Sequence, residues 1–109
     1  MKILTIGDVV GEAGLDALHA LLRRIKRDTG ADFVIVNGEN AAGNGVLPRQ
    51  ADDIFAAGAD VITLGNHVFG KQQIVPYLDS RSDVLRPANL APQSPGRGWG
   101  IYDGPQGMR

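Results

Sequence analysis

The chain has 109 residues, of which 43% are hydrophobic and 21% are charged, and its formal net charge is −1. This composition fits one small globular domain, and the near-neutral charge gives no general reason to bind a membrane or sequence-specific nucleic acid. The absence of cysteine excludes disulfides, thiolate metal sites and cysteine nucleophiles. No apolar run approaches the roughly 20 residues that span a bilayer, and no leader pattern is visible, so we expect a cytoplasmic protein.

Short apolar runs alternate with helical patterns from the start of the chain. The runs that predict strands are Ile3–Ile6, Phe33–Val36, Val61–Leu64 and residues 84–85. After a loop over residues 8–14, leucines recur at helical spacing from Leu15, and this pattern predicts a helix that Gly30 ends. A second helix is predicted from Pro48, whose missing N–H costs little at a first helical position, to Gly58.

A third helix is predicted over residues 71–79. Pro76 lies inside it, so this helix is short, kinked or begins later than the pattern suggests. Strands that alternate with helices indicate an α/β fold with a parallel sheet, and continuously apolar strands indicate that both faces are covered. If the strand order runs in one direction across the sheet, right-handed connections place these helices on one face only. The other face then needs more polypeptide or a second molecule.

The character of the chain changes after residue 87. Residues 89–100 are rich in proline, glycine, glutamine and serine, which is typical of a long loop. Trp99–Tyr102 is predicted as one arm of a hairpin whose turn starts at Asp103, and no second arm follows before Arg109. We therefore expect residues 1–87 to form a βα core, and the 109 residues to be the N-terminal part of a larger single domain.

Three of the apolar runs stop at side chains that bind metals or transfer protons. Asp8 follows the first run, Glu39 and Asn40 follow the second, and Asn66 and His67 follow the third. The carboxyl ends of parallel strands meet at one edge of a sheet, so these side chains should converge there. Their oxygens suit a hard cation, and histidine can ligate a metal or transfer a proton. The simpler alternatives are that Asp8 caps a helix or lies in a turn, and that Glu39 faces solvent in a turn.

Other polar residues carry weaker signals. His19 shares an amphipathic helix with buried leucines and is interpreted as a surface residue. Lys71 and Arg86 are candidate phosphate contacts, and the basic cluster at residues 23–27 is interpreted as a solvated helix face. The sequence contains no dinucleotide-binding glycine motif, P-loop, serine-hydrolase elbow or zinc-protease motif.

Several short segments together resemble a known family. They are GDVVG at residues 7–11, NGENAAG at 37–43, GNH at 65–67, RPAN at 86–89 and PGRG at 95–98. In order and over essentially the whole chain, they are similar to the YmdB-like branch of the calcineurin-like metallophosphoesterases. The broader superfamily usually begins with Asp-x-His, whereas Val9 and Val10 follow Asp8 here, as in this branch.

The resemblance implies the N-terminal βαβαβα portion of a four-layer α/β sandwich that holds two metal ions, iron or manganese. By position, Asp8 would bind one metal, Asn66 the other, and Glu39 would bridge both. Asn40 would lie close to the site. His67 would protonate the leaving oxygen or stabilise the phosphoryl transition state. The implied reaction is hydrolysis of a small phosphodiester, with 2′,3′-cyclic nucleotides as substrates.

Two departures from the family limit what the chain can do alone. The family takes further metal-binding histidines from its second half, whereas His19 and His67 are the only histidines here. An acidic residue often follows the Gly-Asn-His block, and this chain has Phe69-Gly70-Lys71 instead. We therefore expect a longer parent protein to be the phosphodiesterase and the isolated 109 residues to be inactive.

Two other interpretations stay open from the sequence. The chain could be a non-enzymatic receiver-like or nucleotide-binding α/β module that binds one magnesium ion. It could also be a structural remnant that associates with itself through the uncovered face of its sheet. In either the enzyme or the remnant interpretation, the open face is expected to meet a second copy of the chain or a C-terminal half of the domain.

Overall fold

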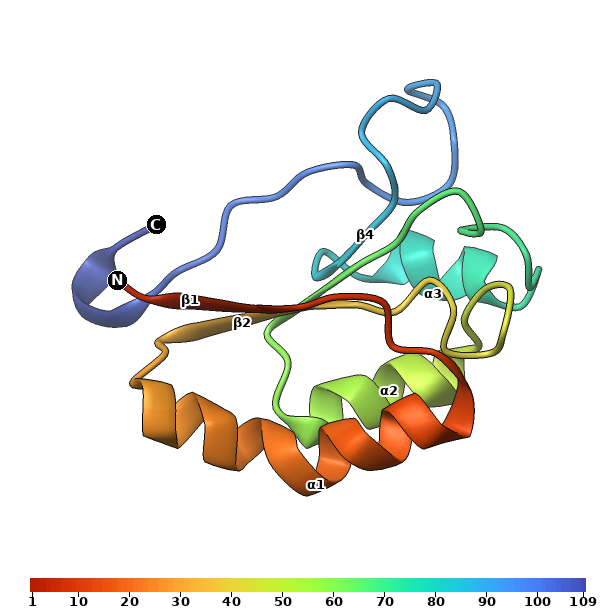
Figure 1. The fold of residues 1–109 in the computed structure, drawn as a ribbon. Coiled ribbons are helices and arrows are strands. Elements are labelled where there is room, and N and C mark those ends of the chain that lie inside the picture. Colours follow the sequence, from red (N-terminus) through yellow and green to blue (C-terminus); the bar gives the residue numbers. More distant parts are fainter.

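The computed structural model describes all 109 residues and contains one four-stranded parallel sheet (Figure 1). The strands are β1 (Ile3–Ile6), β2 (Phe33–Asn37), β3 (Val61–Thr63) and β4 (Val84–Leu85). The helices are α1 (Gly11–Thr29), α2 (Pro48–Ala57) and α3 (Ile74–Ser80), and a short 3₁₀ turn, η1, covers Pro105–Gly107. The strands lie in chain order, β1-β2-β3-β4. The predicted α/β fold with a parallel sheet is confirmed.

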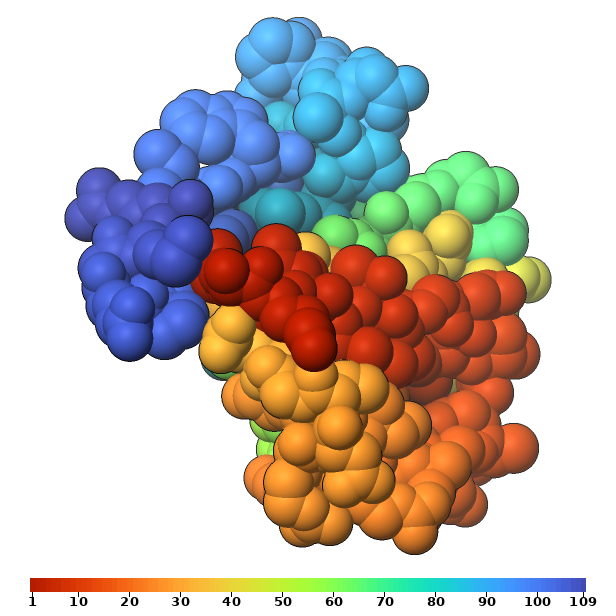
Figure 2. All heavy atoms as spheres, turned by 60° about the vertical axis from the view of Figure 1, so that its left-hand side comes forward, coloured from red at the N-terminus to blue at the C-terminus, as the bar shows by residue number.

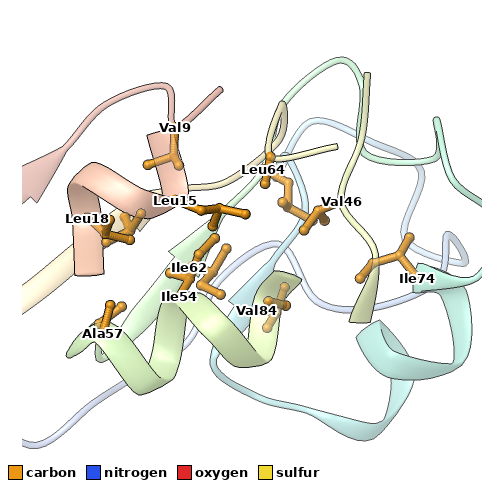
Figure 3. Packing of buried hydrophobic residues seen from close by; sticks show 14 of the residues in the cluster. Val9, Leu15, Leu18, Val46, Ile54, Ala57, Ile62, Leu64, Ile74 and Val84 are labelled. Atoms are coloured by element: carbon orange, nitrogen blue, oxygen red, sulfur yellow. The ribbon is translucent and has the colours of Figure 1, made fainter. Parts of the chain in front are cut away.

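One face of the sheet carries the hydrophobic core. Ile6, Val36, Ile62 and Val84 occupy paired positions across the four strands, and the last three are fully buried. Against them pack apolar side chains of all three helices, among them Leu15 of α1, Ile54 of α2 and Ile74 of α3 (Figure 3). The three helices therefore cover the same face, which is the arrangement that right-handed connections impose on strands in chain order.

The opposite face of the sheet is only partly covered. Ile3 is 50% exposed, and Phe33 and Ile35 are half-buried. The final segment crosses this side of the molecule, with the ring of Tyr102 6.1 Å from that of Phe33, and it ends beside the N-terminus (Figures 1 and 2). The chain thus forms one sheet and one helical layer of the four layers that the resemblance implies.

The helices begin at positions that differ from the prediction. α1 begins at Gly11 rather than near Leu15, because backbone hydrogen bonds from Val9 to Asn37 and from Gly11 to Asn40 hold its first turn against the loop after β2. α3 begins at Ile74, so Pro76 lies in its first turn, where its missing N–H breaks no helical bond. None of the helices combines the length and apolarity that crossing a membrane requires.

Trp99–Tyr102, predicted as one arm of a hairpin, is not a strand within these 109 residues. The chain turns at η1 without a returning arm. A single bridge joins Leu85 to Arg97, and the Tyr102 hydroxyl donates to the carbonyl of Ser82. The segment is therefore held by isolated contacts with β4 and with the turn before it, and glycines at 98, 100 and 104 weaken any strand there.

Candidate metal centre

The polar residues of the predicted site lie in the loops that follow β1, β2 and β3, at one edge of the sheet. Backbone hydrogen bonds join these loops where the strands end. Gly38 donates to the carbonyl of Thr63 at 3.0 Å, and Val9 donates to the carbonyl of Asn37 at 3.1 Å. The parallel register thus places three loops that are distant in sequence side by side, as the carboxyl ends of parallel strands require.

Asn40 links Asp8 to His67. Its Nδ2 donates to Asp8 Oδ1 at 2.8 Å, and its Oδ1 lies 2.8 Å from His67 Nδ1. Because an amide oxygen can only accept, this arrangement assigns the proton of the ring to Nδ1 and leaves Nε2 free to exchange a proton. The three side chains form a continuous hydrogen-bond chain along the edge of the sheet.

Glu39 lies beside this chain. The backbone N–H of His67 donates to Glu39 Oε2 at 3.3 Å, and the same oxygen is 3.7 Å from His67 Nδ1. The Glu39 side chain is 18% exposed. Gly65 makes the approach possible, because a Cβ at that position would collide with the Glu39 carboxylate. Gly65 belongs to the Gly-Asn-His motif, but residue type alone does not indicate this close approach to Glu39.

Asp8 occupies an uncommon backbone conformation, with φ at 46°. This left-handed region costs free energy for residues other than glycine, and aspartate tolerates it better than most. Asp8 does not cap α1, since the residue before that helix is Val10 and no side chain caps it. The helix-cap interpretation of Asp8 is therefore wrong. Its side chain is instead held by Asn40 at the edge of the sheet.

Asn66 is exposed, and its side chain makes no hydrogen bond. Its neighbours Gly65 and His67 contact Glu39, so Asn66 lies at the same edge but outside the hydrogen-bond chain. His19 is exposed on α1 and takes no part in these contacts.

The residues present fit part of a metal site. Their donors are carboxylate and amide oxygens and one imidazole, which suit manganese, iron or magnesium better than soft metals. No group of three carboxylate, imidazole or thiol side chains comes close enough together to hold a metal ion. A metal at this edge would therefore need further ligands, and Glu39, 18% exposed, is a more enclosed donor than His67, 39% exposed.

The chain resembles known proteins over most of its length. The family described as “YmdB-like protein” matches residues 4–109. A 2′,3′-cyclic-nucleotide 2′-phosphodiesterase from Bacillus subtilis (strain 168) is 40% identical over 99 residues, which cover 90% of this chain and 38% of that protein. This chain therefore spans well under half of that relative.

Two crystal structures are similar to this chain along nearly all of its length. A hypothetical protein from Thermus thermophilus has a TM-score of 0.82 and 37% identity, over 94% of this chain and 40% of that chain. A novel phosphatase from Mycoplasma pneumoniae has a TM-score of 0.81 and 31% identity, over 90% of this chain and 37% of that one. The sheet and helices described above thus match a part of two longer structures.

Proposed function

We propose, because the chain belongs to the YmdB-like family, that it forms the N-terminal part of a metal-dependent phosphodiesterase that hydrolyses 2′,3′-cyclic nucleotides. The relatives are described as a phosphodiesterase and a phosphatase. The observation that carries the proposal is the hydrogen-bond chain from Asp8 through Asn40 to His67, with the Glu39 carboxylate beside it. A receiver-like module has no use for a histidine in this position.

The residues that would hold two metal ions are Asp8, Glu39 and Asn66. Two such ions, iron or manganese, would lower the pKa of an attacking water and neutralise charge on the phosphoryl oxygens. Asn40 orients the Asp8 carboxylate by donating to it, and the His67 N–H holds the Glu39 carboxylate. The side chain of Asn66 has no competing hydrogen bond. The remaining ligands would come from outside these 109 residues.

His67 is the proposed general acid. Asn40 holds its Nδ1, so Nε2 is the nitrogen that can carry the second proton. The side chain is 39% exposed and can therefore reach a bound substrate. When a cyclic phosphodiester opens, the bond from phosphorus to one ribose oxygen breaks, and that oxygen would take the proton from Nε2.

A chimaera tests the proposal. Residues 1–109 would replace the matching segment of the Bacillus subtilis relative, which supplies the rest of the domain. We expect hydrolysis of 2′,3′-cyclic AMP with bound metal. Glu39→Gln should lose metal and activity together. His67→Ala should keep the metal and lose about 10²–10⁴-fold in turnover, which is the usual contribution of general acid catalysis.

The matched control is His19→Ala, which removes an exposed imidazole from α1 and should change neither metal content nor rate. A substrate with an activated phenol leaving group needs little protonation, so His67→Ala should slow its hydrolysis less. A folding defect would slow both substrates equally. A folded chimaera that binds one magnesium ion and hydrolyses neither substrate would instead support the receiver-like interpretation.

A further inference from the structure

A pocket of about 560 Å³ lies between the end of β4 and the loop over residues 88–101. Ten residues line it, and none of them is acidic. Its charged groups are the guanidinium groups of Arg86 and Arg97. None of the residues of the candidate metal centre lines it, so this pocket is a separate site. In Figure 1 the loop lies on the opposite side of the sheet from α1 and α2.

Arg86 is 8% exposed, which is unusual for a charged residue. Its Nε has no hydrogen-bond partner and is shielded from solvent. The side chain makes one hydrogen bond, from Nη1 to the carbonyl of its neighbour Pro87 at 3.1 Å, and it forms no ion pair. A buried guanidinium without an acidic partner raises the free energy of the folded state. An oxyanion bound in the pocket would offset this cost.

The loop is held closely against this guanidinium. The backbone N–H of Arg86 donates to the carbonyl of Arg97 at 2.8 Å, which brings the second arginine to the pocket. A Cβ at Gly98 would lie 2.7 Å from Ala88 Cα and 3.1 Å from Arg86 Nη1. Only glycine allows this approach. The positions of both arginines are therefore set by the backbone of the loop.

Two guanidinium groups without an acid select an anion of high charge, and arginine matches the geometry of phosphate oxygens. The volume lies within the range of small-molecule sites, which exceeds what a single inorganic ion needs. Trp99 also lines the pocket, and it is 72% exposed. An exposed indole is a surface on which a nucleobase can stack. We propose that this pocket binds a mononucleotide, with its phosphate monoester on Arg86 and Arg97 and its base on Trp99.

Trp99 is the only tryptophan of the chain, so its fluorescence reports on this pocket alone. Titration with AMP should change that fluorescence saturably, and inorganic phosphate should compete with AMP better than acetate does. Arg86→Met removes the charge but keeps the length of the side chain, and it should weaken AMP binding by about tenfold or more, because a charge-assisted hydrogen bond is lost. Arg24→Met, an equal change on the exposed side of α1, should have no effect.

A metal chelator should leave AMP binding unchanged, which separates this site from the candidate metal centre. Arg97→Met alters an exposed side chain and should also weaken binding, so the test stands even where Arg86→Met fails to fold. An unsaturable response to AMP would overturn the proposal. Equal competition by acetate and phosphate would also overturn it, as would unchanged affinity in both variants, because the ligand would then not be recognised through its phosphate.

Discussion

Gly65 controls how closely the loop after β3 approaches Glu39. Gly65→Ala should weaken Mn²⁺ binding and lower the free energy of unfolding by about 1–3 kcal/mol, the usual cost of forcing an extra methyl group into filled space. The reason is the collision of the new Cβ with the Glu39 carboxylate. Isothermal titration with Mn²⁺ and urea unfolding would measure the two effects.

Gly7→Ala is the matched control for this substitution. Gly7 lies directly before Asp8, and a Cβ there would meet nothing within 4 Å. Its effect on stability should stay within about 0.5 kcal/mol, as for substitutions without a packing consequence. Equal losses in both variants would mean that glycine is needed for backbone freedom along this edge, and the proposed contact with Glu39 would not be the cause.

At the residue scale, the sequence predicted that polar side chains lie at one edge of the sheet, but not which of them are joined by hydrogen bonds. Asp8, Glu39 and His67 follow strand patterns, and parallel strands bring their carboxyl ends to one edge. The bridging position of Asn40 depends on the left-handed backbone of Asp8 and on the direction of the loop after β2. Neither feature follows from residue type, so Asn40 was expected only close to the site, whereas the structure joins it to Asp8 and His67.

At the element scale, one cluster joins α2, α3 and the turn before β4. The guanidinium of Arg81 donates twice to the Asp83 carboxylate, at 2.8 and 2.9 Å, and it lies 4.5 Å from the ring centre of Phe55 and 5.2 Å from that of Tyr77. The hydrogen bonds from Arg81 are the main reason that the pKa of Asp83 is lowered. Burial and a hydrogen bond to Asp52 raise the pKa of Tyr77, so its hydroxyl stays protonated and donates.

The lowered pKa of Asp83 makes the contribution of this cluster depend on pH. A carboxylate whose pKa is lowered by folding stabilises the folded state above its ordinary value, here 3.8, and that contribution is lost as the pH falls through the folded pKa. Asp83→Asn should therefore reduce stability by about 1 kcal/mol at neutral pH, the upper value for a partly exposed pair. The difference from the unmodified chain should shrink in acid below the ordinary carboxyl range.

Urea unfolding at neutral and acidic pH would measure this dependence. The control is Asp103→Asn, which breaks the pair with Arg109 at the same 2.8 Å distance, but with both side chains about 70% exposed. Because exposed pairs contribute little, this control should change stability only slightly at either pH. A difference for Asp83→Asn that stays constant down to strong acid would show that Asp83 acts through packing alone.

The positions of the helices and strands were predictable where a periodic apolar pattern ended at glycine or proline. The helix ends at Gly30 and Gly58 and the start at Pro48 follow from such local rules. The start of α1 at Gly11 depends on hydrogen bonds to the loop after β2, which is distant in sequence. Residues 99–102 form no strand, because none of the segments within these 109 residues pairs with them along their length.

At the scale of the whole molecule, the open face of the sheet exposes apolar surface. An apolar pocket of about 380 Å³ lies there, lined by residues of β1, β2 and the final segment. Met1 and Ile3 are 47% and 50% exposed, and β1 is an edge strand. We expect the 109-residue chain to form a dimer or a higher oligomer through this face, because contiguous apolar surface and an open edge both favour association.

Light scattering over a range of concentrations would measure this association. Ile3→Lys places a charge on the open face and should shift the population toward monomer. Leu21→Lys, at an exposed apolar residue of α1, is the control and should leave the oligomer unchanged. A well-folded chain that stays monomeric at high concentration would show that the final segment already covers this face sufficiently.

The order of the strands also bears on how the molecule is assembled during its synthesis. Each strand pairs with the strand that precedes it in the chain. The strands therefore leave the ribosome in the order in which they lie in the sheet. Among these four strands, none has to insert between two earlier ones, and each connection is made by the segment that has just emerged. The loops that carry Asp8, Glu39 and His67 are all outside the ribosome once residue 67 has left the exit tunnel. The nascent chain can therefore bring these three loops together before β4 has emerged.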